Sequence, residues 1–218
     1  MIYTDLTKKA MRIAFDAHKD QVDKAGLPYI FHPFHLAEQM DTEEEVIVAL
    51  LHDVVEDTDI TLDDLRAFGF SEQIIDALSI LSHADGIPYP RYICNIKYSG
   101  NDLVKKVKLV DLRHNSDETR YNEIGEKDKE RLEKYNKAIG VLSGTDDYWS
   151  YYLNDDTGAI VRFNSTNITQ TMAANSTQWV SIPPDNSYMR EIWLGQGNNC
   201  LTQTTEKAAN KLIEQWQG

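Results

Sequence analysis

An uninterrupted apolar run at residues 46–51 leads directly into four titratable side chains, and no other feature constrains the fold as strongly. The four are His52, Asp53, Glu56 and Asp57. Six consecutive apolar residues predict a buried helix, with Asp41 or Thr42 as its N-cap and acidic residues in its first turn. If that helix continues past residue 51, His52 and Glu56 lie one turn apart, and so do Asp53 and Asp57.

Charged groups at the end of a buried helix are costly unless something neutralises them. A divalent metal ion does so, because it binds carboxylate oxygens and a neutral imidazole nitrogen. Other segments offer two more ligands: His32, where Pro33 predicts the first turn of a helix, and Asp111, which interrupts an apolar helix. Two imidazoles and two carboxylates, without a thiolate, suit Mn, Fe, Co or Zn with open positions for water and substrate.

Each candidate ligand also has a purely structural interpretation. The acidic stretch could be a solvated helix end, and His32 could be a core histidine bonded to the backbone. Asp111 could form a structural salt bridge with a lysine such as Lys108. A metal site requires the separate segments to converge, whereas these alternatives do not.

The composition of the chain changes near residues 143–145. Before that point the apolar spacing is helical, and helices are expected at 5–22, 33–40, 42–51, 61–68, 71–81, 91–97, 103–115 and 129–142. After it, aromatic and Thr-rich segments predict strands at 148–153, 159–163, 178–182 and 188–194, followed by a helix at 204–216. We therefore predict a mainly α fold: a helical domain, residues 1–143, and a small C-terminal extension, residues 144–218, of antiparallel strands plus a helix.

Charge and cysteine usage exclude several classes of protein. The formal net charge of −13 disfavours non-specific binding to nucleic acid or to anionic membranes. No apolar run approaches the roughly 20 residues that span a bilayer, and the N-terminus does not look like a signal peptide. Cys94 and Cys200 are too far apart to suggest a disulfide framework or a zinc knuckle. We expect a cytoplasmic protein without a nucleic-acid or membrane partner; homo-oligomerisation stays open.

Four sequence elements, taken together, resemble the HD-domain metal phosphohydrolases, and in particular the hydrolase domain of the RelA/SpoT family and the small alarmone hydrolases. The elements are residues 17–21 (AHKDQ), 26–33 (GLPYIFHP), 51–58 (LHDVVEDT), and 107–111 (VKLVD) with Asn115. They occur in the family's order and spacing, and the similarity covers about residues 5–142. A lone His-Asp pair is a weak signal, whereas the full set is specific.

The resemblance implies an HD-domain helical bundle and a ligand set for one Mn ion. That set is His32, His52, Asp53 and Asp111. It further implies that Glu56 and Asp57 flank the reacting water, and that Asn115 contacts the ribose or phosphate of a nucleotide. The implied reaction removes the 3′-pyrophosphate from (p)ppGpp and leaves GDP or GTP. The chemistry is coherent, because a metal ion activates water and a placed carboxylate handles the proton.

Two stretches depart from the family pattern. The family usually has arginine before lysine after Gln21, whereas this chain has Asp23 before Lys24. An aspartate cannot stack on guanine as a guanidinium does, and it repels phosphate. Lys24 stays a phosphate-binding candidate, with an ordinary surface lysine as the alternative. The family's Asp-Arg-Leu-His-Asn is reordered at residues 111–115, and Asn115 could simply be a polar helix-end residue.

These departures leave two further hypotheses open beside (p)ppGpp hydrolysis. The same site could act on another nucleotide or on a pyrophosphorylated metabolite. Alternatively, it could bind metal and nucleotide without turnover, as a regulatory module whose C-terminal extension contacts a protein partner.

Overall fold

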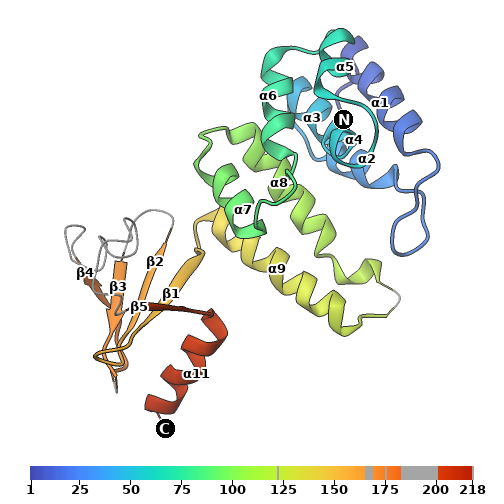
Figure 1. Cartoon of the computed structure of the whole chain (residues 1–218). Coiled ribbons are helices and arrows are strands. Elements are labelled where there is room, and N and C mark those ends of the chain that lie inside the picture. Colours follow the sequence, from blue (N-terminus) through green and yellow to red (C-terminus); the bar gives the residue numbers. More distant parts are fainter. Residues whose placement is uncertain (122, 165–168, 175, 183–200, 218) are drawn as a thin grey trace. The chain divides into compact units, whose positions relative to one another are not determined.

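The computed structural model describes residues 1–121, 123–164, 169–174, 176–182 and 201–217 (Figure 1). Within them the chain forms two units, Met1–Asp146 and Asp147–Gly218. No helix in the described ranges has both the length and the apolar character needed to cross a bilayer. Cys94 is a buried free thiol, and Cys200 lies outside the described residues.

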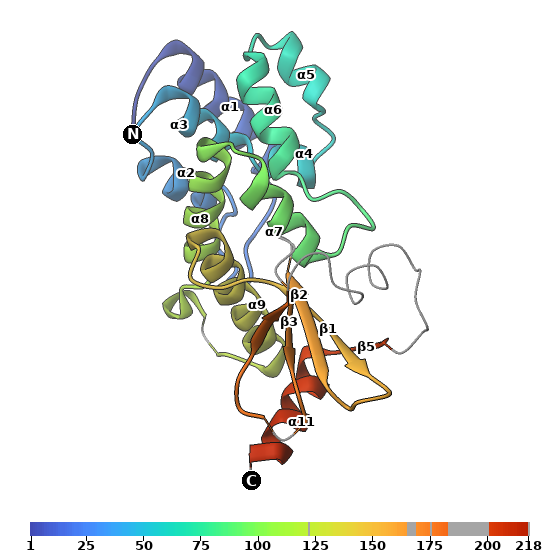
Figure 2. The ribbon, with the colours of Figure 1, turned by 90° about the vertical axis from the view of Figure 1, so that its left-hand side faces the viewer.

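The first unit is helical, as predicted. Its elements are α1 (Asp5–His18), α2 (Phe31–Glu38), α3 (Glu43–Leu51), α4 (Val54–Asp57), α5 (Leu62–Ala67), α6 (Glu72–Leu81), α7 (Tyr89–Tyr98), α8 (Asp102–Asn115), the 3-10 helix η1 (Glu118–Arg120) and α9 (Glu126–Ser143). Helix α3 lies among α1, α2, α6 and α8, all of which it contacts (Figures 1 and 2). The unit is therefore organised around one buried helix.

Helix α3 begins and packs as its sequence dictates. The Thr42 hydroxyl accepts the N–H of Glu45 at 3.2 Å and caps the helix, while Asp41 pairs with Lys106 at 2.8 Å. Of the two candidate N-caps, Thr42 is thus the one used. Residues 46–51 are all fully buried, and each large aliphatic side chain among them contributes about 1.5–3 kcal/mol of burial free energy.

The helix does not continue through the His-Asp pair, so the condition of that expectation is not met. Asp53 and Asp57 are still one turn apart, because the N–H of Asp57 donates to the carbonyl of Asp53 at 2.8 Å. Helix α3 ends at Leu51, His52 and Asp53 form a turn, and α4 begins at Val54. The His52 ring donates from Nδ1 to the carbonyl of Ala49 at 2.8 Å, the acceptor that the N–H of Asp53 would use in a continuing helix. A side chain therefore competes for the backbone acceptor, and the helix ends where the site begins.

Helices α8 and α9 contact each other and form the opposite wall of the site. The side chain of Asn101 accepts the N–H of Val104 at 3.2 Å and caps α8. Asp111 is buried among the apolar residues of this helix, as its position in the sequence suggested. Helix α9 ends at Gly144, whose φ of +79° is the left-handed conformation that stops helices.

The second unit is an antiparallel sheet followed by a helix, as predicted. Its strands are β1 (Trp149–Asn154), β2 (Ile160–Asn164), β3 (Thr169–Met172), β4 (Val180–Ile182) and β5 (Leu201–Thr204), in the order β4-β3-β2-β1-β5, and α11 (Glu206–Gln217) follows. Strands β3 and β5 were not predicted, and the strand predicted at 188–194 lies outside the described residues. Helix α11 covers one sheet face, where Tyr151, Ile160 and Ala209 are buried together.

Candidate active site

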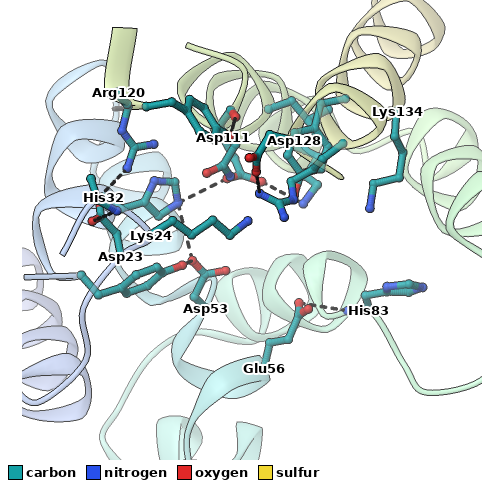
Figure 3. A pocket seen from close by; sticks show the side chains of 18 of the residues that line it. Asp23, Lys24, His32, Asp53, Glu56, His83, Asp111, Arg120, Asp128 and Lys134 are labelled. Carbon is teal, nitrogen blue, oxygen red and sulfur yellow. Dashed lines mark hydrogen bonds and ion pairs between the residues drawn. The ribbon is translucent and has the colours of Figure 1, made fainter. Parts of the chain in front are cut away.

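Four polar side chains from three separate segments meet inside the first unit, and Figure 3 shows three of them, His32, Asp53 and Asp111. His32 comes from α2, His52 and Asp53 from the turn after α3, and Asp111 from α8. Ligand atoms of the first three lie within 4.8 Å of one another. Asp53 Oδ2 is 3.0 Å from His52 Nε2 and 3.5 Å from His32 Nε2. Asp111 Oδ1 is 3.3 Å from His32 Nε2 and 3.9 Å from His52 Nε2.

His52 is oriented for a cation. Its Nδ1 must carry a proton, because its partner is the carbonyl of Ala49 and a carbonyl only accepts. Its Nε2 is buried, makes no hydrogen bond within the described structure, and faces the carboxylate of Asp53. Burial lowers the pKa of His52, but Asp53 and Asp111 outweigh it and raise this pKa to about 9. A divalent metal ion would take the place of that proton, so these residues fit a metal site.

Asp111 uses its two oxygens for different partners. Oδ2 accepts a hydrogen bond from Lys108 Nζ at 2.8 Å, whereas Oδ1 faces the two imidazoles and accepts one from Asn115 Nδ2 at 2.6 Å. Burial alone would raise the pKa of Asp111. Lys108 and the two histidines lower this pKa by more than burial raises it, so the carboxylate stays ionised. The salt bridge considered as an alternative is therefore present together with the ligand geometry.

Asp53 has a second partner that the sequence interpretation missed. The hydroxyl of Tyr29 donates to Asp53 Oδ2 at 2.5 Å, the same oxygen that lies nearest the imidazoles. Burial raises the pKa of Tyr29, and the charge of Asp53 raises it further, so the phenol keeps its proton. The signal for this role was available, because Tyr29 belongs to the 26–33 element.

The two candidate catalytic acids lie in different places. Glu56 lines the cavity, and its Oε2 accepts the backbone N–H of His83 at 3.3 Å (Figure 3). Burial raises the pKa of Glu56 and also that of Asp57, where Asp53 adds to the effect. Asp57 is not among the lining residues, and its carbonyl instead accepts from Gln21 Nε2 at 3.3 Å.

The cavity has a volume of about 630 Å³ and is lined by groups of both charges. His32, Asp53, Asp111 and Glu56 line one part of it, whereas His52 is not among the lining residues. Another part is lined by the cations Lys24, Arg120, Arg131 and Lys134 together with the acids Asp23, Glu123 and Asp128. Asp23 pairs with Arg120, and Asp128 pairs with Arg131. Lys24 makes no hydrogen bond or ion pair with any described residue, and burial together with the charge of Arg131 lowers its pKa. Lys24 and Lys134, which form no ion pair with a described carboxylate, are available to an anionic ligand in this chain of net charge −13.

Comparison with known proteins identifies relatives of part of the chain. No family model matches the chain. It is 45% identical over 75 residues to the guanosine-3′,5′-bis(diphosphate) 3′-pyrophosphohydrolase of Vibrio cholerae, and 35% identical over 86 residues to the bifunctional (p)ppGpp synthase/hydrolase SpoT of Escherichia coli. These alignments cover 32% and 38% of this chain, but only 11% and 12% of the relatives' lengths.

The fold is shared with a solved structure described as a metazoan ortholog of SpoT that hydrolyses ppGpp. The TM-score is 0.54 at 21% sequence identity, and the match covers 67% of this chain and 90% of the other. The chain resembles a RelA/SpoT-type hydrolase domain. The resemblance inferred from the four sequence elements is therefore confirmed, as is the helical-bundle fold that it implied.

The cavity also contains the main departure from the family pattern. The Oδ2 of Asp23 pairs with Arg120 Nη2 at 3.0 Å, and its Oδ1 accepts the N–H groups of Ala25 and Leu27, both at 2.9 Å. The negative charge of Asp23 is thus matched by a guanidinium from η1. Burial lowers the pKa of His114, and the neighbouring His32 and Arg120 lower it further, to about 3.

Arg120, Arg131 and Lys134 were missed because no local pattern marks them. They approach the site only through the packing of α9 and η1 against α8 and the 19–30 loop.

Proposed function

We propose that the first unit is a metal-dependent hydrolase that removes the 3′-pyrophosphate from (p)ppGpp. The observation that carries this proposal is the convergence of four potential metal ligands, three of which line one cavity together with Glu56 and several cations. The relatives are named for reactions of this substrate, and the shared fold supports the comparison. A nucleotide with two phosphate groups would use both parts of such a cavity. The metal-ligand side would hold the phosphate whose bond breaks, and the cations would bind the other phosphates.

The proposed metal ligands are those expected from the sequence: His32, His52, Asp53 and Asp111. Nitrogen and carboxylate donors without a thiolate suit Mn²⁺, which we propose as the ion. When bound, it polarises a phosphoryl oxygen and promotes ionisation of water. Tyr29 and Ala49 hold Asp53 and His52 in place through hydrogen bonds, and such supporting contacts typically matter about 10–100-fold for metal affinity.

Glu56 is the better placed of the two acids to move the proton. The His83 N–H holds one of its oxygens at 3.3 Å, which leaves the other free to accept the proton of the attacking water. Water attacks the phosphorus bonded to the ribose 3′-oxygen, the P–O bond to that oxygen breaks, and the oxygen takes up a proton as pyrophosphate leaves. The raised pKa of Glu56 brings it closer to the working pH, which favours general-base catalysis. A catalytic role for Asp57 stays a prediction.

The cationic side of the cavity would bind the remaining phosphates. Lys24 and Lys134 make no salt bridge to a described carboxylate, and Lys134 lies 4.5 Å from the ring centroid of Tyr89. A volume of about 630 Å³ is in the range of small-molecule sites, about 300–1,000 Å³. Asn115 lines the same cavity and is proposed to contact the ribose or a phosphate.

A cytoplasmic location stays a prediction, and homo-oligomerisation stays open.

A direct assay tests the proposal. The purified full chain is incubated with Mn²⁺ and ppGpp, and the products are separated by anion exchange. We expect GDP and pyrophosphate from the wild type, and none from the double variant His52→Ala, Asp53→Ala. A folded, Mn-loaded wild type that releases neither product would refute this substrate.

Asp23 favours a second candidate, in which the same chemistry acts on another nucleotide or on a pyrophosphorylated metabolite. Its motivation is the missing arginine that would stack on guanine. A panel that varies the base while keeping both phosphate arms separates the two candidates. Equal kcat/KM for guanosine and adenosine compounds would favour the second.

A further inference from the structure

Four side chains form a continuous row of contacts from the 19–30 loop to the proposed metal site. Asp23 Oδ2 is 3.0 Å from Arg120 Nη2, and Arg120 Nη1 is 3.1 Å from His114 Nδ1. His114 Nδ1 is in turn 2.7 Å from Nδ1 of His32. His32 is the only member of this row among the proposed metal ligands.

The direction of these hydrogen bonds follows from chemistry. A guanidinium only donates, so the His114 nitrogen that faces Arg120 must carry a lone pair. The proton of the neutral His114 ring is then on Nε2. Because His114 Nδ1 is an acceptor, the His32 nitrogen opposite it must be the donor. His32 therefore carries a proton on Nδ1, and its Nε2 is the nitrogen that faces Asp53 and Asp111 and would bind the metal ion.

The two proposed histidine ligands thus reach the same tautomer by different means. The partner of His52 is the backbone carbonyl of Ala49, which can only accept. The partner of His32 is another imidazole, which can accept or donate and so fixes nothing by itself. A donor-only neighbour of His114 removes that ambiguity, and Arg120 is that neighbour.

Arg120 is itself held in place. Its Nη1 also donates to the carbonyl of His114 at 3.1 Å, and Asp23 binds its other terminal nitrogen. The side chains of Asp23 and Arg120 are only 14% and 27% exposed, so this pair is less screened than a surface ion pair. On its other side, the His114 ring is stacked with His35, with centroids 4.4 Å apart.

We propose that Asp23 and Arg120 are positioning residues that fix the tautomer of His32 through His114, and thereby hold its Nε2 ready for the metal ion. The inference rests on the proposed metal site, but it does not require that ppGpp is the substrate. It also gives a function to Asp23, the residue that departs most clearly from the family pattern.

Nuclear magnetic resonance tests the tautomers directly. Long-range ¹H–¹⁵N spectra of the metal-free protein assign the protonated nitrogen of each imidazole. We expect the Nε2–H form of His114 in the wild type and in Arg120→Lys, which keeps a donor-only cation. Arg120→Met should show a mixture with the Nδ1–H form. An Nδ1–H form of His114 in the wild type would overturn the proposal without any variant.

Mn²⁺ binding, measured from the electron paramagnetic resonance signal of the free ion, tests the consequence. We expect Arg120→Met to raise the Kd roughly tenfold, the lower end of the range for residues that orient metal ligands. The matched control is Arg113→Met, an exposed arginine at the end of α8, next to His114 in the sequence. Equal Kd values for these two variants would overturn the proposal.

Two substitutions of His114 complete the test. His114→Asn offers an amide oxygen to His32 and should keep the wild-type Kd within about threefold, whereas His114→Leu should weaken Mn²⁺ binding as Arg120→Met does. Equal effects of Asn and Leu would contradict the hydrogen-bond argument. Neither readout uses turnover, so a protein that binds Mn²⁺ but leaves ppGpp intact would refute the proposed function and not this inference.

Discussion

Replacing Asp111 by alanine should do two separable kinds of damage. The first is loss of metal binding, because Asp111 Oδ1 faces both imidazoles. The second is loss of stability without any metal, because Asp111 Oδ2 is the partner of the buried Lys108. The side chains of Lys108 and Asp111 are 15% and 6% exposed, so water replaces little of the lost interaction. The ring of Tyr92, whose centroid lies 5.2 Å from the ammonium, compensates for only part of this loss.

The magnitude follows from the geometry of the pair. At the observed 2.8 Å separation and an effective dielectric constant of about 20, the Coulomb attraction is about 6 kcal/mol. Desolvation offsets part of it, and removing one partner of a buried pair costs about 3–5 kcal/mol overall. For a domain of this size, that corresponds to a decrease in Tm of roughly 6–20 °C. The double variant Asp111→Ala, Lys108→Met removes both charges and should recover most of the loss.

The assay is urea denaturation in EDTA, followed by Mn²⁺ titration of the folded proteins. We expect the single variant to be strongly destabilised, the double variant to be near wild type, and both to lack Mn²⁺ binding. Asp111→Ala with unchanged stability would refute the buried-pair argument, and so would a double variant no more stable than the single one. Stoichiometric Mn²⁺ in either variant would refute the ligand assignment.

Three further predictions test other parts of the account. Glu56→Gln should keep Mn²⁺ and lower kcat by about 10²–10⁴. Since desolvation raises the pKa of Glu56, the wild-type kcat should begin to fall, as the pH decreases, at a pH above the ordinary pKa of glutamate. A pH-rate profile of both proteins checks this. Lys24→Met should raise KM for ppGpp roughly tenfold with little change in kcat, because one charged hydrogen bond to the substrate is lost. Lys19 is exposed, and Lys19→Met should leave the steady-state kinetics unchanged. Leu50 is fully buried, and Leu50→Ala should lower the free energy of unfolding, measured by urea denaturation, by about 2–5 kcal/mol. Leu27 is 57% exposed, and Leu27→Ala should change that free energy by less than about 0.5 kcal/mol.

Local signals in the sequence were sufficient for most of the helical unit. Apolar spacing predicted the buried helix at residues 46–51, and the Thr-x-x-Asp pattern from Thr61 predicted the start of α5, where the capping box is present. The end of α3 was not predictable in the same way. It depends on the His52 ring donating to the carbonyl of Ala49, a side-chain choice that propensity does not report.

The candidate site was predictable only where its residues belong to a known pattern. The four proposed ligands and Glu56 lie in such elements, and the structure brings the ligands together beside the cavity that Glu56 lines. Arg120 and Lys134 do not, because their place depends on the packing of elements that are distant in the chain. In the second unit, strands β3 and β5 are only four residues long and lack clear alternation, so neither gave a period-2 signal.

The central claim is that one divalent ion binds among the four side chains. The most direct measurement is anomalous diffraction from a crystal grown with Mn²⁺, with data collected above and below the manganese edge. We predict a single anomalous peak about 2 Å from His32 Nε2, from His52 Nε2 and from a carboxylate oxygen of both Asp53 and Asp111. A map without a peak there, or with the four side chains turned away from one another, would contradict the account.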